Sequence, residues 1–355
     1  MKKTHFLIIV VLLGLSFVLS SCVSGPRVTG TPGISLADET AVVAYGPYVY
    51  GLDAESGSVV WHFPEKKDNK IVFYATPLLA DSFVYIGDLA NNFYKLNIAN
   101  GDVEWTFSEA KGYFIGQAAE ADGIVYAPCN DGNLYAISAE GNLLWTFETG
   151  HYIWAQPQVT DDVVYIASMD HYVYALTKDG EELWSTEMAG AVVGAPALSE
   201  DGSVIYVGSI GKDMVALDTT TGDHLWTFDA NESLESIWGN PLLIEDVLYF
   251  ADSGGQLYAL KADDAESVWQ TNISGTVVSG LTMIEDGFVL AIQEGTIKAV
   301  GFDGSPKWES TLDGEIYQAP AESGDILVAG TIKGDNLVYG YNLTGAQLWS
   351  TTPED

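Results

Sequence analysis

Short strand-like runs separated by polar turns repeat along almost the whole chain. One stretch shows the pattern clearly, with runs at Trp154–Thr160, Val163–Ala167, Tyr172–Thr177 and Glu182–Glu187 separated by turns rich in aspartate and glycine. Each run is five to seven residues long, which is typical of strands and too short for most helices. This spacing predicts an all-β fold with four strands in each repeated unit.

Eight tryptophans recur at intervals of 39 to 44 residues and set the period of this pattern. A phrase such as Tyr174-Ala175-Leu176, then Gly180, then Trp184 ends each unit with an indole. A glycine four residues before the tryptophan suits a tight turn that needs a positive φ, and only the sixth unit differs, with Ala265. We interpret the tryptophans as structural residues of the repeat. They are Trp61, Trp105, Trp145, Trp184, Trp226, Trp269, Trp308 and Trp349.

A period of about 40 residues built from short strands is typical of a β-propeller with one blade per repeat. The phrase Tyr-Ala-Leu followed by Gly-x-x-x-Trp, at Tyr135–Trp145, Tyr174–Trp184 and Val215–Trp226, resembles the repeat of the PQQ-like (quinoprotein-like) propellers. The resemblance implies an eight-bladed β-propeller of four antiparallel strands per blade, filling residues 32–355. Ring closure stays open, through contiguous blades or through a strand supplied by the N-terminal tether.

The N-terminus is typical of an export signal. Lys2-Lys3 precede Phe6–Leu19, an apolar stretch too short for an ordinary membrane-spanning helix. Leu19-Ser20-Ser21-Cys22 resembles a bacterial lipobox, which implies cleavage before Cys22 and a lipid on its sulfur. We therefore expect a lipoprotein signal peptide at 1–21 and a lipidated tether at 22–31. The alternative is an ordinary signal peptide with an incidental cysteine.

Composition restricts the partners. The formal net charge is −35, and the single arginine, Arg27, lies in the expected tether. Nucleic acid is excluded as a partner because phosphate binding needs a basic surface. The acidity is consistent with solubility or with adaptation to a salty environment. No EF-hand-like calcium phrase occurs, and the histidines lack metal-ligand spacing, so we expect no metal site.

The residues also argue against enzyme activity. Quinone-dependent relatives of this fold generally carry an adjacent cysteine pair, whereas Cys22 and Cys129 are the only cysteines here. The quinone is a tricarboxylate that favours arginine partners, and the expected propeller has no arginine. We expect no cofactor and no catalytic site.

One set of residues indicates a candidate binding ring. Four aromatic residues stand three positions before a unit-opening proline, and amides stand two positions after the equivalent place in three units. In a strand, two such positions share a face, which by analogy with the family would line the central channel or its mouth. An aromatic and amide surface suits an extended peptide or a sugar, although the side chains could instead only fill the centre. The residues are Tyr74, Trp154, Trp238, Tyr317, Gln117, Gln156 and Asn240.

The resemblance extends to BamB-type lipoproteins, which support assembly of outer-membrane proteins. It implies a monomeric, non-enzymatic scaffold that binds protein partners in the cell envelope. The expected location is the periplasmic face of the outer membrane, or the outer face of the cytoplasmic membrane in a cell with one membrane. Two alternatives stay open: a carbohydrate or small-molecule receptor that uses the channel, and a degenerate quinoprotein dehydrogenase.

Overall fold

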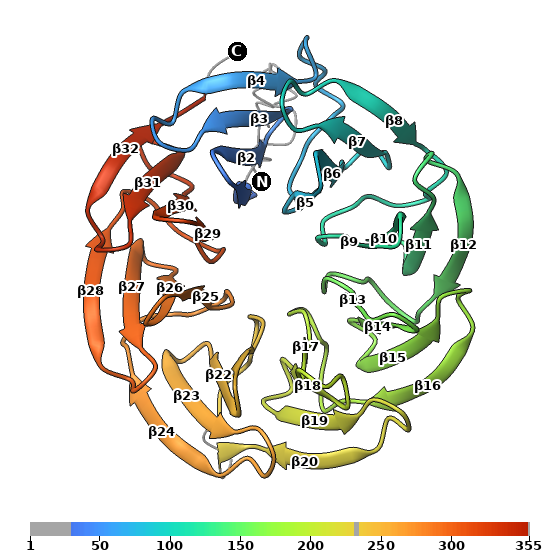
Figure 1. The fold of residues 1–355 in the computed structure, drawn as a ribbon, viewed down its shortest axis with the longest axis vertical. Coiled ribbons are helices and arrows are strands. Elements are labelled where there is room, and N and C mark those ends of the chain that lie inside the picture. Colours follow the sequence, from blue (N-terminus) through green and yellow to red (C-terminus); the bar gives the residue numbers. More distant parts are fainter. Residues whose placement is uncertain (1–29, 231–233, 354–355) are drawn as a thin grey trace, which may run out of the picture.

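The computed structural model of the protein describes residues 30–230 and 234–353. These residues form eight four-stranded antiparallel sheets arranged as blades around a central axis (Figure 1). The expected all-β, eight-bladed propeller is confirmed. The expected signal peptide at 1–21, the lipidated Cys22 and the tether up to residue 29 lie outside the described residues.

Each blade consists of four strands that follow one another in the chain. Blades 1 to 4 contain β1 (Gly33–Ala37), β2 (Thr40–Tyr45), β3 (Tyr48–Asp53), β4 (Val59–Phe63); β5 (Leu78–Ala80), β6 (Phe83–Gly87), β7 (Phe93–Asn97), β8 (Val103–Phe107); β9 (Ala119–Ala121), β10 (Ile124–Pro128), β11 (Asn133–Ile137), β12 (Leu143–Glu148); and β13 (Gln158–Val159), β14 (Val163–Ala167), β15 (Tyr172–Thr177), β16 (Glu182–Glu187). Blades 5 to 8 contain β17 (Ala197–Leu198), β18 (Val204–Gly208), β19 (Met214–Asp218), β20 (His224–Phe228); β21 (Leu242–Ile244), β22 (Val247–Ala251), β23 (Gln256–Lys261), β24 (Ser267–Asn272); β25 (Thr282–Ile284), β26 (Gly287–Ile292), β27 (Thr296–Gly301), β28 (Pro306–Thr311); and β29 (Ala321–Ser323), β30 (Ile326–Gly330), β31 (Val338–Asn342), β32 (Gln347–Thr351).

The first strand of every blade is innermost and the fourth forms the outer rim (Figure 1). Strand order within each sheet follows chain order, so each blade is one contiguous segment. In the described part of the chain, the last blade therefore closes against the first without an exchanged strand.

The strand bounds in blade 4 match the sequence-based expectation except at the inner strand. Strands β14, β15 and β16 coincide with the expected runs, but the first run, Trp154–Thr160, was too long because β13 covers only Gln158–Val159. Pro157 has no N–H to contribute to a ladder, so regular pairing begins only after it. The residues before it are still ordered by contacts to neighbouring blades.

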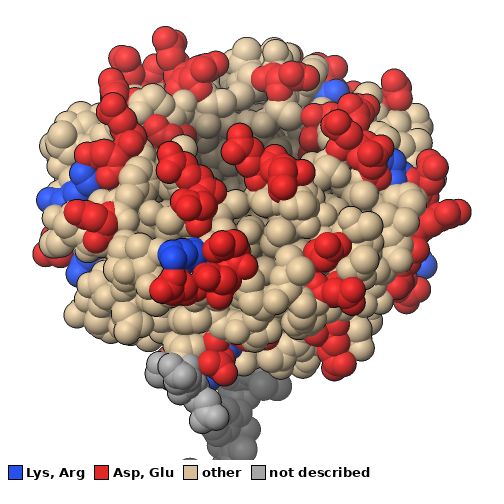
Figure 2. Space-filling view, turned by 60° about the horizontal axis from the view of Figure 1, so that its bottom comes forward, with Lys and Arg blue, Asp and Glu red and all other residues tan. Residues whose placement is uncertain are grey.

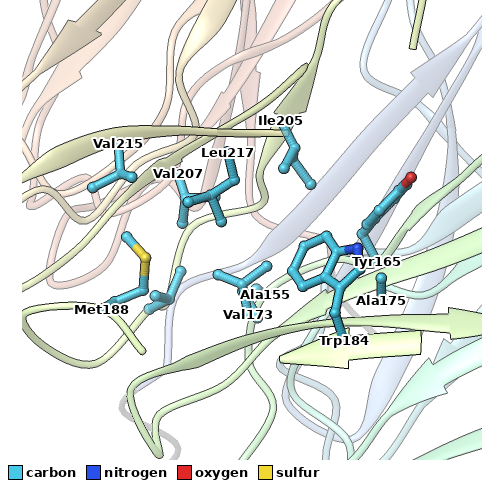
Figure 3. Packing of buried hydrophobic residues seen from close by; sticks show 12 residues of the cluster. Ala155, Tyr165, Val173, Ala175, Trp184, Met188, Ile205, Val207, Val215 and Leu217 are labelled. Carbon is cyan, nitrogen blue, oxygen red and sulfur yellow. The ribbon is translucent and has the colours of Figure 1, made fainter. Parts of the chain in front are cut away.

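The hydrophobic core lies between blades. The described residues form eight buried clusters, and each combines residues of two neighbouring blades. Between blades 4 and 5, the Trp184 indole packs beside Tyr165 and Ala175, while Ile205 and Leu217 come from blade 5 (Figure 3). The same arrangement joins blade 8 to blade 1, so the ring closes through side-chain packing.

Each repeat tryptophan also donates a hydrogen bond to the next blade. Trp184 Nε1–H donates to the Thr219 carbonyl at 2.9 Å, and the other indoles reach the equivalent carbonyl at 2.8 to 2.9 Å. The last of these bonds runs from Trp349 to Ala54 and joins the two ends of the ring at 2.8 Å. The indoles thus connect every blade to its successor.

The glycine of the repeat phrase makes this docking possible. Gly222 lies under the Trp184 indole, where an added Cβ would come within 2.7 Å of ring atoms, and its φ is +75°. Both restrictions favour glycine, because a side chain would clash and an L-residue rarely adopts that φ. Ala265, the one replacement, keeps the same backbone shape with a φ of +60°.

Two further features bear on function. The described residues contain no helix long and apolar enough to cross a membrane. Cys129, the cysteine of the described part of the chain, is fully buried in the cluster between blades 2 and 3.

We expect Trp184→Ala to lower the free energy of unfolding by about 3–5 kcal/mol, because it removes a large buried aromatic and its inter-blade hydrogen bond. Its neighbour Leu183 is 52% exposed on the outer strand, so Leu183→Ala is a matched control that should change stability by less than about 0.5 kcal/mol. Equilibrium denaturation of both variants measures the difference. Equal midpoints would contradict the structural role of the indole.

The Cys129 thiol should be unreactive toward alkylating reagents in the folded protein. Burial raises its pKa to about 12, and only the thiolate is a good nucleophile. At pH 8 the folded protein should therefore leave Cys129 unlabelled by iodoacetamide, whereas denaturant should expose it to complete labelling. Rapid labelling of Cys129 under native conditions would show that this interface opens.

Candidate functional site

A cavity of about 380 Å³ lies on the propeller axis, and residues of all eight blades line it. Its wall comes from the segments that lead into the innermost strands. Six of the seven residues of the expected ring lie in this wall, and Tyr74 does not. The six are Trp154, Trp238, Tyr317, Gln117, Gln156 and Asn240.

Alternation along these segments places the candidate residues toward the axis. In blade 4, Ile153 and Ala155 are buried, while Trp154 and Gln156 between and after them line the cavity. The buried position must be small where it meets the next blade. A Cβ on Gly239, for example, would come within 2.0 Å of the Ser279 carbonyl oxygen. Small residues thus let the inner segments approach closely and form a continuous wall.

The three amides of the expected ring fasten the inner segments of blades 3, 4 and 6 to the preceding blade. Gln117 Nε2 donates to the Pro77 carbonyl and Gln156 Nε2 to the Ala118 carbonyl, each at 3.0 Å. Asn240 Oδ1 accepts a hydrogen bond from the Ala195 N–H at 2.6 Å. Each amide therefore uses one of its groups for structure, and in the described part of the chain its other polar atom has no protein partner.

Two of the aromatic residues are held by an amide that sequence reasoning missed. Trp154 Nε1 donates to Oδ1 of the buried Asn130 at 3.1 Å. Gln293 Nε2 donates to the Tyr317 hydroxyl at 3.0 Å, and that hydroxyl donates to Glu315 at 2.7 Å. The hydrogen bond to Glu315 is the main reason why the pKa of Tyr317 is raised.

Asn130 and Gln293 share a place in the repeat that could have identified them. Asn130 lies two residues after the end of β10, and Gln293 directly follows β26. Each precedes by 24 residues the aromatic residue that it holds in the next blade. The other blades carry mainly apolar residues there, such as Ile210 before Trp238. An aligned comparison of the units would therefore have shown an amide only where an aromatic with a polar atom follows.

The Trp238 side chain is held by fewer contacts than the Trp154 side chain. Its side chain is 38% exposed, and no described residue accepts a hydrogen bond from its indole N–H. Trp154 is half-buried and fixed by Asn130. The two indoles thus present one fixed and one open aromatic surface on either side of Val193, which also lines the cavity.

Tyr74, the fourth aromatic residue of the expected ring, is not among the residues that line the cavity. Its ring lies against Gly30, so close that a Cβ there would be 1.6 Å from Cε1. Blade 1 begins with small residues at this point, and Tyr74 occupies the space that a larger side chain would need. Equivalent position in the repeat therefore did not secure an equivalent environment.

Charge is distributed unevenly between the cavity and the surface. Carboxylates are spread over the surface and around the rim of the central hollow (Figure 2). By contrast, none of the described residues that line the cavity carries a charge. The described residues also include no group of three or more His, Cys, Asp or Glu placed to hold a metal ion.

Comparison with known proteins gives the family. A family model described as outer membrane protein assembly factor BamB matches residues 19–151, 130–286 and 275–355. BamB of Burkholderia pseudomallei (strain K96243) is 27% identical over 113 residues, which cover 31% of this chain and 29% of that protein. BamB of Nitrosomonas eutropha is 30% identical over 144 residues, which cover 39% of this chain and 34% of that protein.

The alignments thus span about a third of the length of each of these relatives. The crystal structure of BamB from Moraxella catarrhalis has the same fold, with a TM-score of 0.74 at 17% identity over 87% of this chain and 96% of that one. Since the three stretches matched by the family model together run from residue 19 to residue 355, the chain belongs to the family of the outer membrane protein assembly factor BamB.

Proposed function

We propose that this protein is a non-enzymatic, lipid-anchored scaffold that binds protein partners in the cell envelope and supports the assembly of outer-membrane proteins. The observation that carries the proposal is the match of the BamB family model along nearly the whole chain. The relatives bear the name of an assembly factor, and a propeller of eight tightly joined blades offers a rigid surface for partners.

The residues around the axis support a role without catalysis. Among the described residues that line the cavity, the polar groups besides the indole N–H are amides and the hydroxyls of Ser, Thr and Tyr, and none is a carboxylate, histidine, lysine or cysteine. The buried Cys129 thiol is protonated at neutral pH because burial raises its pKa to about 12. A quinone cofactor would find no arginine in residues 32–355 and no adjacent cysteine pair in the sequence.

The anchor follows from the sequence Leu19-Ser20-Ser21-Cys22. Lipid chains on Cys22 would hold the propeller at a membrane, since each buried CH₂ contributes about 0.8 kcal/mol. The acidic surface would not itself favour anionic lipid. It would favour a partner with a basic surface, and such an association should weaken as salt screens the charges.

Crosslinking in intact cells, followed by purification of the native protein and mass spectrometry, tests this proposal. We expect a protein of the outer-membrane assembly machinery as the main partner, with recovery without crosslinker falling between about 50 and 500 mM salt because exposed charges are then screened. Cys22→Ser is the matched variant. It should lose lipid labelling and membrane association while its thermal midpoint stays unchanged.

Two results would contradict the proposal. One is an unmodified Cys22 in the mature native protein, which would remove the anchor. The other is reproducible crosslinking with no outer-membrane assembly protein among the partners, which would remove the assembly role.

A further inference from the structure

We propose that the central cavity binds a neutral saccharide of about one or two rings, stacked on the indoles of Trp154 and Trp238. A volume of about 380 Å³ lies within the range of about 300–1,000 Å³ that is usual for small-molecule sites. Saccharide binding in this cavity goes beyond the proposed scaffold function, because it needs no protein partner.

The charge pattern excludes the most common alternatives. Charged residues make up 18% of the chain, yet the described residues of the cavity wall include none. A phosphate, a carboxylate or an acidic sugar would enter without a cationic partner, and a cation without an anionic one. Removing an ion from water without such a partner is costly. The wall therefore selects against charged ligands, although the surface of the protein is strongly acidic.

The aromatic residues supply the stacking surface. The C–H face of a sugar ring is apolar and flat enough to pack against an indole, whose face carries partial negative charge. Trp154 is held in orientation by Asn130, so little conformational freedom is lost when a ligand stacks on it. Trp238 is 38% exposed in the same wall, two blades further round the ring. The two indoles can thus contact one ligand from two sides of Val193.

The amides supply hydrogen bonds of both kinds. Gln117 and Gln156 use Nε2 to bind backbone carbonyls, which leaves Oε1 of each as an acceptor. Asn240 uses Oδ1 to accept from Ala195, which leaves Nδ2 as a donor. A sugar hydroxyl both donates and accepts, so it matches a wall that offers both functions. These side chains are already fixed by their structural bonds, which favours a preorganised site.

Titration calorimetry and tryptophan fluorescence of the full purified chain test the proposal. The probes are maltose, cellobiose and N,N′-diacetylchitobiose, with digalacturonate as the charged control. We expect saturable binding of at least one neutral probe with a Kd of about 1 mM or tighter, and no binding of digalacturonate. The same probe should lose affinity roughly tenfold or more in Trp238→Ala, a variant that should fold because the side chain is partly exposed.

Two further variants separate the cavity from other surfaces. Tyr113→Ala removes an aromatic that is also 38% exposed but lies outside the cavity wall, so its affinity should stay unchanged. Asn240→Asp keeps the acceptor for Ala195 but replaces the free donor with a charged oxygen, so binding should weaken while the thermal midpoint changes little. Thermal melts of each variant confirm that the propeller is folded.

The proposal would be overturned if none of the three neutral probes bound saturably up to about 20 mM, a concentration that detects even very weak sites. Binding that Trp238→Ala and Asn240→Asp leave unchanged would place the sugar elsewhere and also overturn it. Preferential binding of digalacturonate, or of an uncharged acetylated and amidated peptide of Gly, Ser and Thr over the sugars, would assign the cavity to another class of ligand.

Discussion

The hydrogen bond from each repeat indole to the carbonyl of the next blade is the interaction on which the propeller depends. A single four-stranded blade cannot bury both faces of its sheet, so it needs a neighbour on each side. The indole buries apolar area against that neighbour and also donates its N–H to a backbone carbonyl there. Trp349 makes the same bond to Ala54, so the junction between the last and the first blade is joined like the others.

Close packing of the blades in turn shapes the centre. Glycine and alanine on the inner segments allow backbones to approach, and amides fasten three of these segments to the preceding blade. Side chains that cannot enter these contacts face the axis, where they form a neutral aromatic and amide wall. Many charges lie on the outer surface, where water solvates them (Figure 2), and the buried carboxylates of Asp88, Asp213 and Asp252 accept hydrogen bonds outside the cavity wall. The same packing that stabilises the ring therefore creates a central environment unlike the exterior.

The repeated features of the fold could be predicted from the sequence because each recurs in all or nearly all of the eight units. The indole period fixed the blade number, and the runs around Trp184 gave three strands of blade 4 with correct bounds. The length of the inner strand was overestimated because Pro157 interrupts pairing within an otherwise strand-like run. Repetition thus predicts what every blade shares.

Features of the site that break the repeat were harder to predict. Tyr74 does not line the cavity, and its ring instead occupies the space beside Gly30, which has no side chain. Asn130 was missed because its role depends on a partner 24 residues away in another blade, a relation that shows only when the repeat units are aligned and compared position by position. Equivalent positions in the repeat thus identified six residues that lie together in the cavity wall, whereas the places of Tyr74 and Asn130 depend on contacts between particular blades.

The proposed role of this propeller is to support the assembly of outer-membrane proteins. The most direct measurement is the amount of folded outer-membrane β-barrel protein in the native bacterium after deletion of the chain, with the intact chain and Cys22→Ser returned separately. The account predicts a reduced amount that the intact chain restores and the unanchored variant does not. An unchanged amount in the deletion strain, with protein export otherwise stressed to reveal small defects, would contradict it.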